Sequence, residues 1–478
     1  MKTLFCYLFL FLPVFSQVRP ALEKPNVILI FLDDCGYGDF SHTGNPTIHT
    51  PEISRLVREG LNFPQFYTAS GACTASRYAL LTGRNPRRSG FGTWVLSPNA
   101  SRYLHPNEVT VAEGLKNRGY ATGFFGKWHL GNPNGNNGNT QNAFPLAHGF
   151  DVWEGTNVSN DYDPGANLIK SDPAGNNPIS GYSMIAANML NNLPIHEDLT
   201  RRYRDLSVSF IREKKDKPFF LYVAPNMPHL PVYASDEFKG RSLRGTYGDV
   251  IEEIDAMVGT IVKTLEEEGI AENTLLVFTS DNGPWIRFQN DTNHPKYGDA
   301  RFLIGSALPF RDGKGSTWEG GVRVPGVWYW PGTIEKGRVV SSPASTFDVL
   351  PTVFALAGEP LPTGRTLDGR NISPYLNSST FPGQVPGFEF IYTGSGDNKV
   401  YGARKGPWKL HIRLSSQTGN NYGFSASTSN PLLFNVETDP HERFDLSDNQ
   451  EAEVAELQGL INSFNQSVNT ERTFWGNP

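Results

Sequence analysis

The sequence predicts an α/β fold in which a large, mostly parallel sheet is sandwiched by helices and is followed by a smaller C-terminal antiparallel sheet plus helix. Short apolar runs alternate with amphipathic helical patterns through most of the chain, which is typical of a covered parallel sheet. The length of 478 residues allows one large domain and a smaller one. Near residues 375–388 the pattern changes, and short strand-like segments follow.

Four apolar segments have the length and composition of buried strands in the large sheet. They are Val27–Leu32, Ala121–Phe125, Phe219–Ala224 and Leu275–Thr279.

Two helices and two loops are expected between and after these strands. Tyr247–Glu268 repeats its apolar residues at helical spacing, so it predicts an amphipathic helix. Phe347–Leu356 is expected to be another helix of the large domain. Residues 131–142 and 171–178 are rich in Asn, Gly and Pro, which favours loops.

The C-terminal part predicts a small antiparallel sheet with one packed helix, Glu451–Phe464. Its expected strands are Glu389–Thr393, Val400–Arg404, Trp408–Arg413 and Leu432–Val436. We therefore expect a large domain over residues 17–380 and a C-terminal subdomain over residues 381–478.

The first sixteen residues are typical of a secretory signal peptide. Lys2 supplies positive charge, Leu4–Val14 is apolar, and cleavage is expected after Ser16. This predicts a secreted or periplasmic protein; a buried N-terminal strand is the alternative. No later segment is long and apolar enough to predict a membrane span.

Charge and cysteine content exclude some classes. The 42 basic and 48 acidic residues give a net charge of −6, which does not favour a nucleic-acid surface. Once Cys6 leaves with the signal peptide, only Cys35 and Cys73 remain, which is no disulfide framework. A Cys35–Cys73 bridge stays open at this point.

Polar side chains follow each of the four large-sheet strands. Ligands of parallel α/β sheets bind beyond the carboxyl ends of the strands, so these side chains predict one convergent site. Each alone has a simpler interpretation, because an Asp after a strand is often a turn or cap residue and a His is often a core residue. The residues are Asp33 and Asp34, Lys127 and His129, His229, and Asp281 and Asn282.

Between the first two strands lies Cys73-Thr74-Ala75-Ser76-Arg77, followed after a leucine-rich turn by Thr82-Gly83-Arg84. A lone cysteine at such a place is often only a small buried side chain. The combination, however, resembles the signature of the formylglycine-dependent (type I) sulfatases, members of the alkaline-phosphatase-like superfamily. In that family the first residue is converted after translation to formylglycine.

The resemblance extends from about residue 24 to about residue 446. The further matching segments, in family order, are Lys24–Val27 with Asp33-Asp34 and Gly36–Asp39, Gly126–Gly131, Pro228-His229, Ser280–Gly283, Gly313-Lys314 through Trp318–Gly321, and Leu433–Val436 with Asp439-Pro440. The resemblance implies an alkaline-phosphatase-like fold and the hydrolysis of a sulfate ester.

The resemblance also assigns a metal site. Asp33, Asp34, Asp281 and Asn282 offer hard oxygen ligands that suit Ca²⁺, with Mg²⁺ as a possible substitute. The cation would hold a sulfate oxygen beside the nucleophile.

The catalytic roles follow from the same resemblance. The formylglycine hydrate made from Cys73, held by Arg77, would attack sulfur, while Lys127 and Lys314 hold sulfate oxygens. His229, assisted by Lys314, would protonate the leaving oxygen. His129 would then take a proton from the second hydroxyl, which expels sulfate and restores the aldehyde.

Two residues depart from a simple match. Ala75 stands where many members have Pro, which bears on the maturation enzyme that forms formylglycine. Cys35 directly follows the paired aspartates and is expected to be a small buried thiol.

Candidate substrate-binding residues are Ser159, which aligns with a sulfate-contacting serine of some members, and Arg404 and His411. Residues 131–142 and Trp285–Arg311 are further candidates; each of these could equally be a surface residue. Their polar and aromatic content favours a sulfated oligo- or polysaccharide, either an algal galactan such as carrageenan or a glycosaminoglycan.

Several other functions remain open. One is an arylsulfatase acting on small aryl sulfates. Another is a phosphatase or phosphodiesterase of the same superfamily, which would want a Ser or Thr nucleophile and two metals with several His and Asp ligands. The last is a non-catalytic binding protein that keeps Cys73 unconverted.

Overall fold

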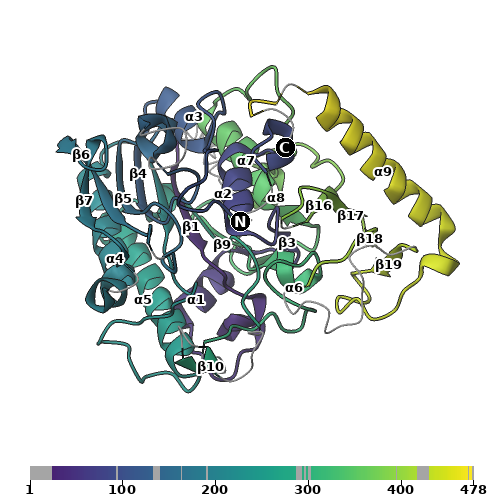
Figure 1. Cartoon of the computed structure of the whole chain (residues 1–478), viewed down its shortest axis with the longest axis horizontal. Coiled ribbons are helices and arrows are strands. Elements are labelled where there is room, and N and C mark those ends of the chain that lie inside the picture. Colours follow the sequence, from purple (N-terminus) through teal and green to yellow (C-terminus); the bar gives the residue numbers. More distant parts are fainter. Residues whose placement is uncertain are drawn as a thin grey trace, which may run out of the picture.

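The computed structural model is built on a ten-stranded mixed sheet flanked by helices, with a four-stranded sheet beside it (Figure 1). It describes residues 24–92, 95–132, 140–162, 164–189, 192–286, 303–394, 396–416, 430–471 and 473–475, and the backbone of 293–294 and 298–299. In spatial order the large sheet contains β14 (Arg338–Val339), β2 (Leu61–Asn62), β13 (Val327–Tyr329), β9 (Thr274–Ser280), β1 (Asn26–Leu32), β8 (Phe219–Ala224), β4 (Ala121–Gly126), β5 (Val152–Thr156), β6 (Leu168–Asn176) and β7 (Ser180–Ala186).

The centre of this sheet is parallel and its edges are largely antiparallel. Strands β9, β1, β8, β4 and β5 pair in parallel, with Ile28 of β1 opposite Leu276 of β9 and Leu221 of β8. Strands β6 and β7 continue the sheet antiparallel on one side, and β13 pairs antiparallel with both β9 and β2 on the other. All four expected large-sheet strands are present, and the predicted fold class is confirmed.

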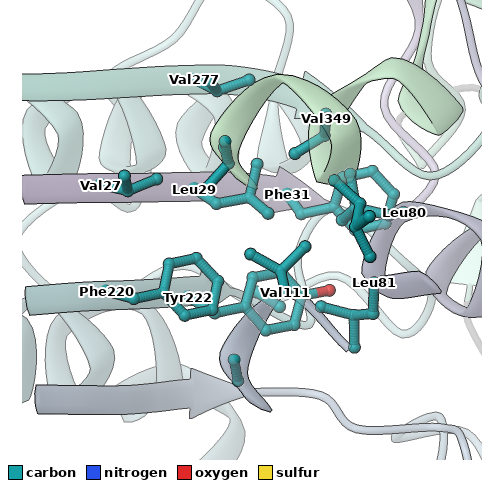
Figure 2. Packing of buried hydrophobic residues seen from close by; sticks show 14 of the residues in the cluster. Val27, Leu29, Phe31, Leu80, Leu81, Val111, Phe220, Tyr222, Val277 and Val349 are labelled. Carbon is teal, nitrogen blue, oxygen red and sulfur yellow. The ribbon is translucent and has the colours of Figure 1, made fainter. Parts of the chain in front are cut away.

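The two faces of the sheet are buried by different helices. Alternate residues of β1 point to opposite faces, so Ile28 joins a cluster with α1, α4 and α5, whereas Leu29 joins a cluster with α2, α3 and α7. Figure 2 shows the second cluster. It labels Val27, Leu29, Phe31, Leu80, Leu81, Val111, Phe220, Tyr222, Val277 and Val349.

The helices agree with the expected periodicity. Tyr247–Glu268 corresponds to α5, and Phe347–Leu356 corresponds to a short 3₁₀ turn followed by α7. The helices are α1 (Pro51–Glu59), α2 (Cys73–Thr82), α3 (Val111–Asn117), α4 (Leu193–Lys214), α5 (Thr246–Glu267), α6 (Glu319–Val322), α7 (Val349–Ala357), α8 (Ser373–Leu376) and α9 (Glu451–Thr470).

The C-terminal part is an antiparallel sheet covered by α9, which runs along the outer side of the molecule (Figure 1). Leu457 and Ile461 of α9 pack on Val400 and Leu410 of the sheet. Its strands are β16 (Glu389–Thr393), β17 (Val400–Lys405), β18 (Trp408–His411) and β19 (Leu432–Asn435).

Two small sheets complete the described structure. One contains β12 (Arg323–Val324), β3 (Phe66–Tyr67) and β15 (Ala344–Ser345), and the other contains β10 (Asn293–His294) and β11 (Gly298–Asp299).

One loop prediction is wrong in part. Residues 171–176, expected to be a loop, belong to β6, which pairs with β7 as an edge hairpin with register shifts. Most of this hairpin is half-buried or exposed rather than fully buried, so it does not need the apolar composition by which a buried strand is recognised.

Some predictions lie outside the described residues. These are the predicted signal peptide at residues 1–16 and most of the predicted loop at residues 131–142. Among the helices that the structure describes, none combines the length and hydrophobicity needed to cross a membrane.

Gly126, the last residue of β4, lies where only a glycine fits between neighbouring strands. Its φ of 130° favours glycine, and an added Cβ would lie 1.9 Å from the carbonyl oxygen of Ala224 in β8. We expect Gly126→Ala to destabilise the fold by about 3 kcal/mol or more, measured by urea unfolding. Gly181→Ala is the control, because it has a φ of 88° with nothing within 4 Å and should cost only about 1 kcal/mol. Equal losses in both variants would contradict the steric argument.

Candidate active site

The structure brings the predicted polar residues together at the carboxyl edge of the parallel strands. Because β9, β1, β8 and β4 are neighbours in this order, the residues that follow them meet at one edge. Asp33 and Asp34 follow β1, Lys127 and His129 follow β4, His229 follows β8, and Asp281 and Asn282 follow β9. All seven side chains are buried.

Two of these residues have strained backbones. Asp34 has a φ of 63° and His129 a φ of 52°, in the left-handed region that non-glycine residues rarely adopt. Such conformations persist where the surrounding structure holds them, and they gather at functional sites. Both residues lie at the edge of the sheet where the polar side chains meet.

Cys73 is the first residue of α2 and is fully buried. Cys35 and Cys73 are both free, so the bridge left open by the sequence is not formed. The Cys73 sulfur lies 3.8 Å from Oδ1 of Asp34. Burial raises the pKa of the Cys73 thiol well above its usual value, so the unmodified side chain would be a neutral thiol and a weak nucleophile.

Arg77 lies one turn further along α2 and ties three strand ends together. Its guanidinium donates to the Lys127 carbonyl at 3.1 Å and to Oδ2 of Asp281 at 2.8 Å, and lies 3.3 Å from Oδ1 of Asp33. Burial opposes the charge on Arg77, but Asp281 and Asp33 outweigh it and raise its pKa. Arg77 is therefore a fixed cation beneath residue 73.

Two lysines face the aspartates. Lys127 Nζ donates to Asp33 Oδ2 at 2.7 Å and to Ser159 Oγ at 2.6 Å, while Lys314 Nζ donates to Asp34 Oδ2 at 2.6 Å. Asp34 outweighs the effect of burial and raises the pKa of Lys314, which therefore stays charged. Ser159 is thus placed beside a predicted sulfate-binding lysine.

The carboxylates have unequal pKa values. Burial alone would raise the pKa of Asp33, but the surrounding cations, Lys127 foremost, hold it well below its usual range. Burial and the negative charge of Asp33 raise the pKa of Asp281 to about 8. Such crowding of carboxylates is relieved by a bound cation.

The ring contacts of His129 suit a general base. Its Nε2 lies 2.9 Å from the Leu96 carbonyl oxygen, which selects the tautomer with the proton on Nε2. Nδ1 is buried and has no hydrogen-bond partner among the described residues, so its lone pair is available. Burial, then the charges of Lys127 and Arg77, lower the pKa of His129 well below its usual value, so the ring is neutral.

His229 has the opposite arrangement. Its Nδ1 lies 2.6 Å from the Leu230 carbonyl oxygen, so Nδ1 carries a proton and Nε2 is the atom left for chemistry. Nε2 lies 3.4 Å from Asp34 Oδ2.

The donor atoms fit a divalent cation. The side-chain oxygen of Asn282 is buried and accepts no hydrogen bond within the described part of the chain, and the Asn282 amide lies 2.7 Å from Asp34 Oδ1. Ligand atoms of Asp33, Asp34, Cys73 and His229 all lie within 4.8 Å of one another. This cluster shares Asp33 and Asp34 with the predicted ligand set, and the carboxylate and amide oxygens favour a hard cation.

A pocket of about 370 Å³ opens over this cluster. The predicted residues Cys73, His129, Ser159, His229 and Lys314 line it, as does Trp285 from a predicted substrate segment. Sequence reasoning did not single out Gly71, Ala72, Val95, Asp161, Tyr162, Gly315, Ser415 and Ser416, which also line it. Asp161 and Tyr162 adjoin the Ser159 segment, whereas no sequence signal distinguished Ser415 from other loop residues.

The structure places Arg404 and His411 elsewhere. Both are fully buried and neither lines the pocket. Arg404 donates to Tyr67 and Gln65, and His411 pairs with Glu442 at 2.7 Å. The prediction that these two residues bind substrate is therefore wrong. A sequence shows which side chains can be cationic, but it does not show the buried acceptors with which they pair in the fold.

Comparisons with known proteins identify the family of the chain. The sulfatase family model matches residues 25–359. Human arylsulfatase A is 38% identical over 449 residues, covering 89% of this chain and 83% of that protein. Rat N-acetylgalactosamine-6-sulfatase is 35% identical over 475 residues, covering 91% and 85%.

A solved structure extends the comparison. The crystal structure of Ps i-CgsB in complex with κ-ι-κ-neocarrahexaose superposes with a TM-score of 0.72 and 27% identity, covering 95% of this chain and 94% of that chain.

Proposed function

Because this chain belongs to the sulfatase family, and is therefore a sulfuric ester hydrolase, we propose that it removes sulfate from a carbohydrate. The observation that carries the proposal is the position of Cys73. It stands at the start of α2, beside Asp34, and lines a pocket that is also lined by Lys314, His129 and His229.

The charges of the site support an anionic substrate. Three carboxylates (Asp33, Asp34, Asp281) face three cations (Arg77, Lys127, Lys314), each within 2.8 Å of a partner. With a divalent cation bound, all three carboxylates would be ionised and would balance the three cations, so the ion would leave the site positive. A positive site favours binding of a sulfate ester. We propose Ca²⁺, with Mg²⁺ as a substitute, held by the carboxylates and the oxygen of Asn282; it would polarise a sulfate oxygen.

Each catalytic residue of the chain then has a separate role in the reaction. Formylglycine at position 73 supplies a hydrate with two hydroxyls, one to attack sulfur and one to release the product. Lys127 and Lys314 hold sulfate oxygens, where negative charge accumulates. His229 gives the proton at Nε2 to the leaving oxygen, and His129 accepts a proton at Nδ1 from the remaining hydroxyl.

The lining of the pocket favours a sugar over a small aryl group. Trp285 and Tyr162 offer aromatic faces, and Asp161, Ser415 and Ser416 offer hydrogen-bonding groups for hydroxyls. The names of two relatives point the same way, one to N-acetylgalactosamine 6-sulfate and one to a carrageenan hexaose. Arylsulfatase activity is the second candidate, since arylsulfatase A shows the higher identity.

A panel of defined sulfated oligosaccharides from carrageenans and glycosaminoglycans, with 4-nitrophenyl sulfate beside them, tests the proposal. We expect kcat/KM on at least one oligosaccharide to exceed that on 4-nitrophenyl sulfate. Turnover of the aryl sulfate alone would favour the second candidate.

His229→Asn should separate leaving groups. Without the proton donor, hydrolysis of a sugar sulfate should fall by about 10²- to 10⁴-fold, because an alkoxide leaves poorly. 4-Nitrophenolate needs little protonation, so kcat/KM on 4-nitrophenyl sulfate should fall far less. His148→Asn is the control, because His148 is buried beside Trp128 away from the pocket. Equal losses on both substrates in His229→Asn would contradict the role of proton donor.

We also propose that the protein is exported and matured. The predicted signal at residues 1–16 implies a secreted or periplasmic product, and Cys73 implies a formylglycine-generating or other maturation enzyme. N-terminal sequencing of the native protein should begin at Gln17, and an intact Met1 would contradict export.

A further inference from the structure

Lys314 lies on a segment with little stiffness of its own. Residues 311–319 read RDGKGSTWE, so glycines flank the lysine on both sides, and Gly315 has a φ of 82°. Lys314 nevertheless has a defined position, with its ammonium 2.6 Å from Asp34. The surroundings must therefore hold the segment in place.

One set of anchors comes from the catalytic side. The backbone N–H of Lys314 donates to the Pro284 carbonyl at 2.9 Å, and that of Gly315 donates to the Gly71 carbonyl at 2.8 Å. These bonds hold the middle of the segment against the loops that follow β9 and precede α2.

The other anchors come from the C-terminal subdomain, and one residue holds both ends of the segment. Glu442 accepts the backbone N–H of Glu319 on its Oε2 at 2.7 Å. The backbone carbonyl of Glu442 accepts from the guanidinium of Arg311 at 3.1 Å. Ser415 adds a bond from its hydroxyl to the Gly315 carbonyl at 2.9 Å.

Glu442 is itself rigidly held. Its Oε1 lies 2.9 Å from Lys409 Nζ and 2.7 Å from His411 Nε2, both on β18. Lys409 also pairs with Glu319 at 2.9 Å, so the segment and the C-terminal sheet share one ion-pair network. The three side chains of Glu442, Lys409 and Glu319 are fully buried, where such contacts are strong and misplacement is costly.

We propose that Glu442 is a positioning residue for Lys314, so that the C-terminal sheet completes the active site. The C-terminal stretch Asp439-Pro440-His441-Glu442 thereby has a role in catalysis. His411 then supports Glu442 instead of contacting the substrate. The proposal rests on the proposed function only in assigning Lys314 to the sulfate and the leaving oxygen.

A double-mutant cycle of Glu442→Ala and Lys314→Ala tests this proposal. A shift of about 1 Å in a catalytic group can cost about 100-fold, so Glu442→Ala should lower kcat/KM by 10- to 100-fold. In the Lys314→Ala background, Glu442→Ala should cost little more, because the residue it positions is gone. Fully additive losses would overturn the proposal.

Two readouts separate positioning from loss of stability. Across aryl sulfates whose phenols have increasing pKa, the loss in Glu442→Ala should grow as the leaving group worsens, as it should in Lys314→Ala. A fall that is uniform across the series would contradict positioning. Aryl substrates keep this result independent of whether a carbohydrate is the natural substrate.

Hydrogen exchange reports on the segment without any turnover. In Glu442→Ala, the backbone amides of Lys314, Gly315 and Glu319 should exchange faster, while those of β1 stay protected. Asp445→Asn is the matched control, because Asp445 holds the backbone of Leu433 and Ser447 in the same C-terminal stretch rather than the Lys314 segment. It should leave both exchange and leaving-group dependence unchanged.

If Glu442→Ala does not fold, Glu442→Gln keeps one oxygen for the Glu319 N–H and loses the charge that binds Lys409 and His411. It should show the same leaving-group trend with a smaller loss. Unchanged exchange at residues 314–319 in a folded Glu442 variant would overturn the proposal.

Discussion

Cys73→Ser should fold like the wild type and lose catalytic turnover, by about 10⁵- to 10⁶-fold, the scale on which removing a nucleophile acts in other hydrolases. The reason is chemical. A serine hydroxyl can accept the sulfuryl group in a first attack, but it has no second hydroxyl whose deprotonation expels sulfate. An aldehyde hydrate has one, and His129 Nδ1 is available to take that proton.

The variant should therefore become trapped after one step. Mass spectrometry of the peptide containing residue 73 should show aldehyde in the wild type, and serine carrying one SO₃ group in the variant after exposure to substrate. Production in a host without serine-type maturation keeps residue 73 as serine. Multiple turnovers in that preparation would contradict the aldehyde mechanism.

Cys35→Ala is the matched control. Cys35 is the other free buried cysteine, and its sulfur lies 3.8 Å from Asp39 rather than beside the nucleophile. The control should keep the aldehyde at residue 73 and lose activity only in proportion to any unfolded fraction.

The large sheet could be predicted because its signal is local. Each central strand, such as β1 or β8, is an apolar run buried on both faces, and the polar residues directly after it must lie at the sheet edge. The strand pattern alone therefore predicts that Asp33, Lys127 and Asp281 lie near one another. Their individual partners, such as Arg77 with Asp281, depend on how α2 packs against the strand ends, which the pattern does not define.

The parts that could not be predicted depend on contacts between distant segments. Arg404 and His411 are of residue types that often bind substrates, but in the fold they pair with Gln65 and Glu442, which lie in other segments of the chain. Ser415 reaches the pocket only because β18 ends beside residues 311–319. The β6–β7 hairpin could not be predicted for a different reason, since strands that are only partly buried have no need of a continuous apolar pattern.

Removing the divalent cation should abolish activity and lower the thermal stability of the protein. The oxygen of Asn282 is buried without a hydrogen-bond donor among the described residues, and Asp33, Asp34 and Asp281 crowd one another. A bound cation would coordinate the Asn282 oxygen and would reduce the repulsion among the three carboxylates. At about a thousandfold excess over Kd, a bound ion contributes about 4 kcal/mol, so chelation should lower Tm by several degrees. Added Ca²⁺ should restore both Tm and activity.

The variant Asp281→Asn tests whether the stabilisation by the cation arises at this site. This substitution removes a ligand carboxylate, so the variant should be nearly inactive, and the chelator should change its Tm little. Asp348→Asn is the matched control: Asp348 is equally buried but pairs with Arg370 at 2.9 Å. It should lower Tm in either condition and keep the full chelator-induced shift. A full shift in Asp281→Asn, or activity in protein shown by elemental analysis to be free of metal, would contradict a cation at this site.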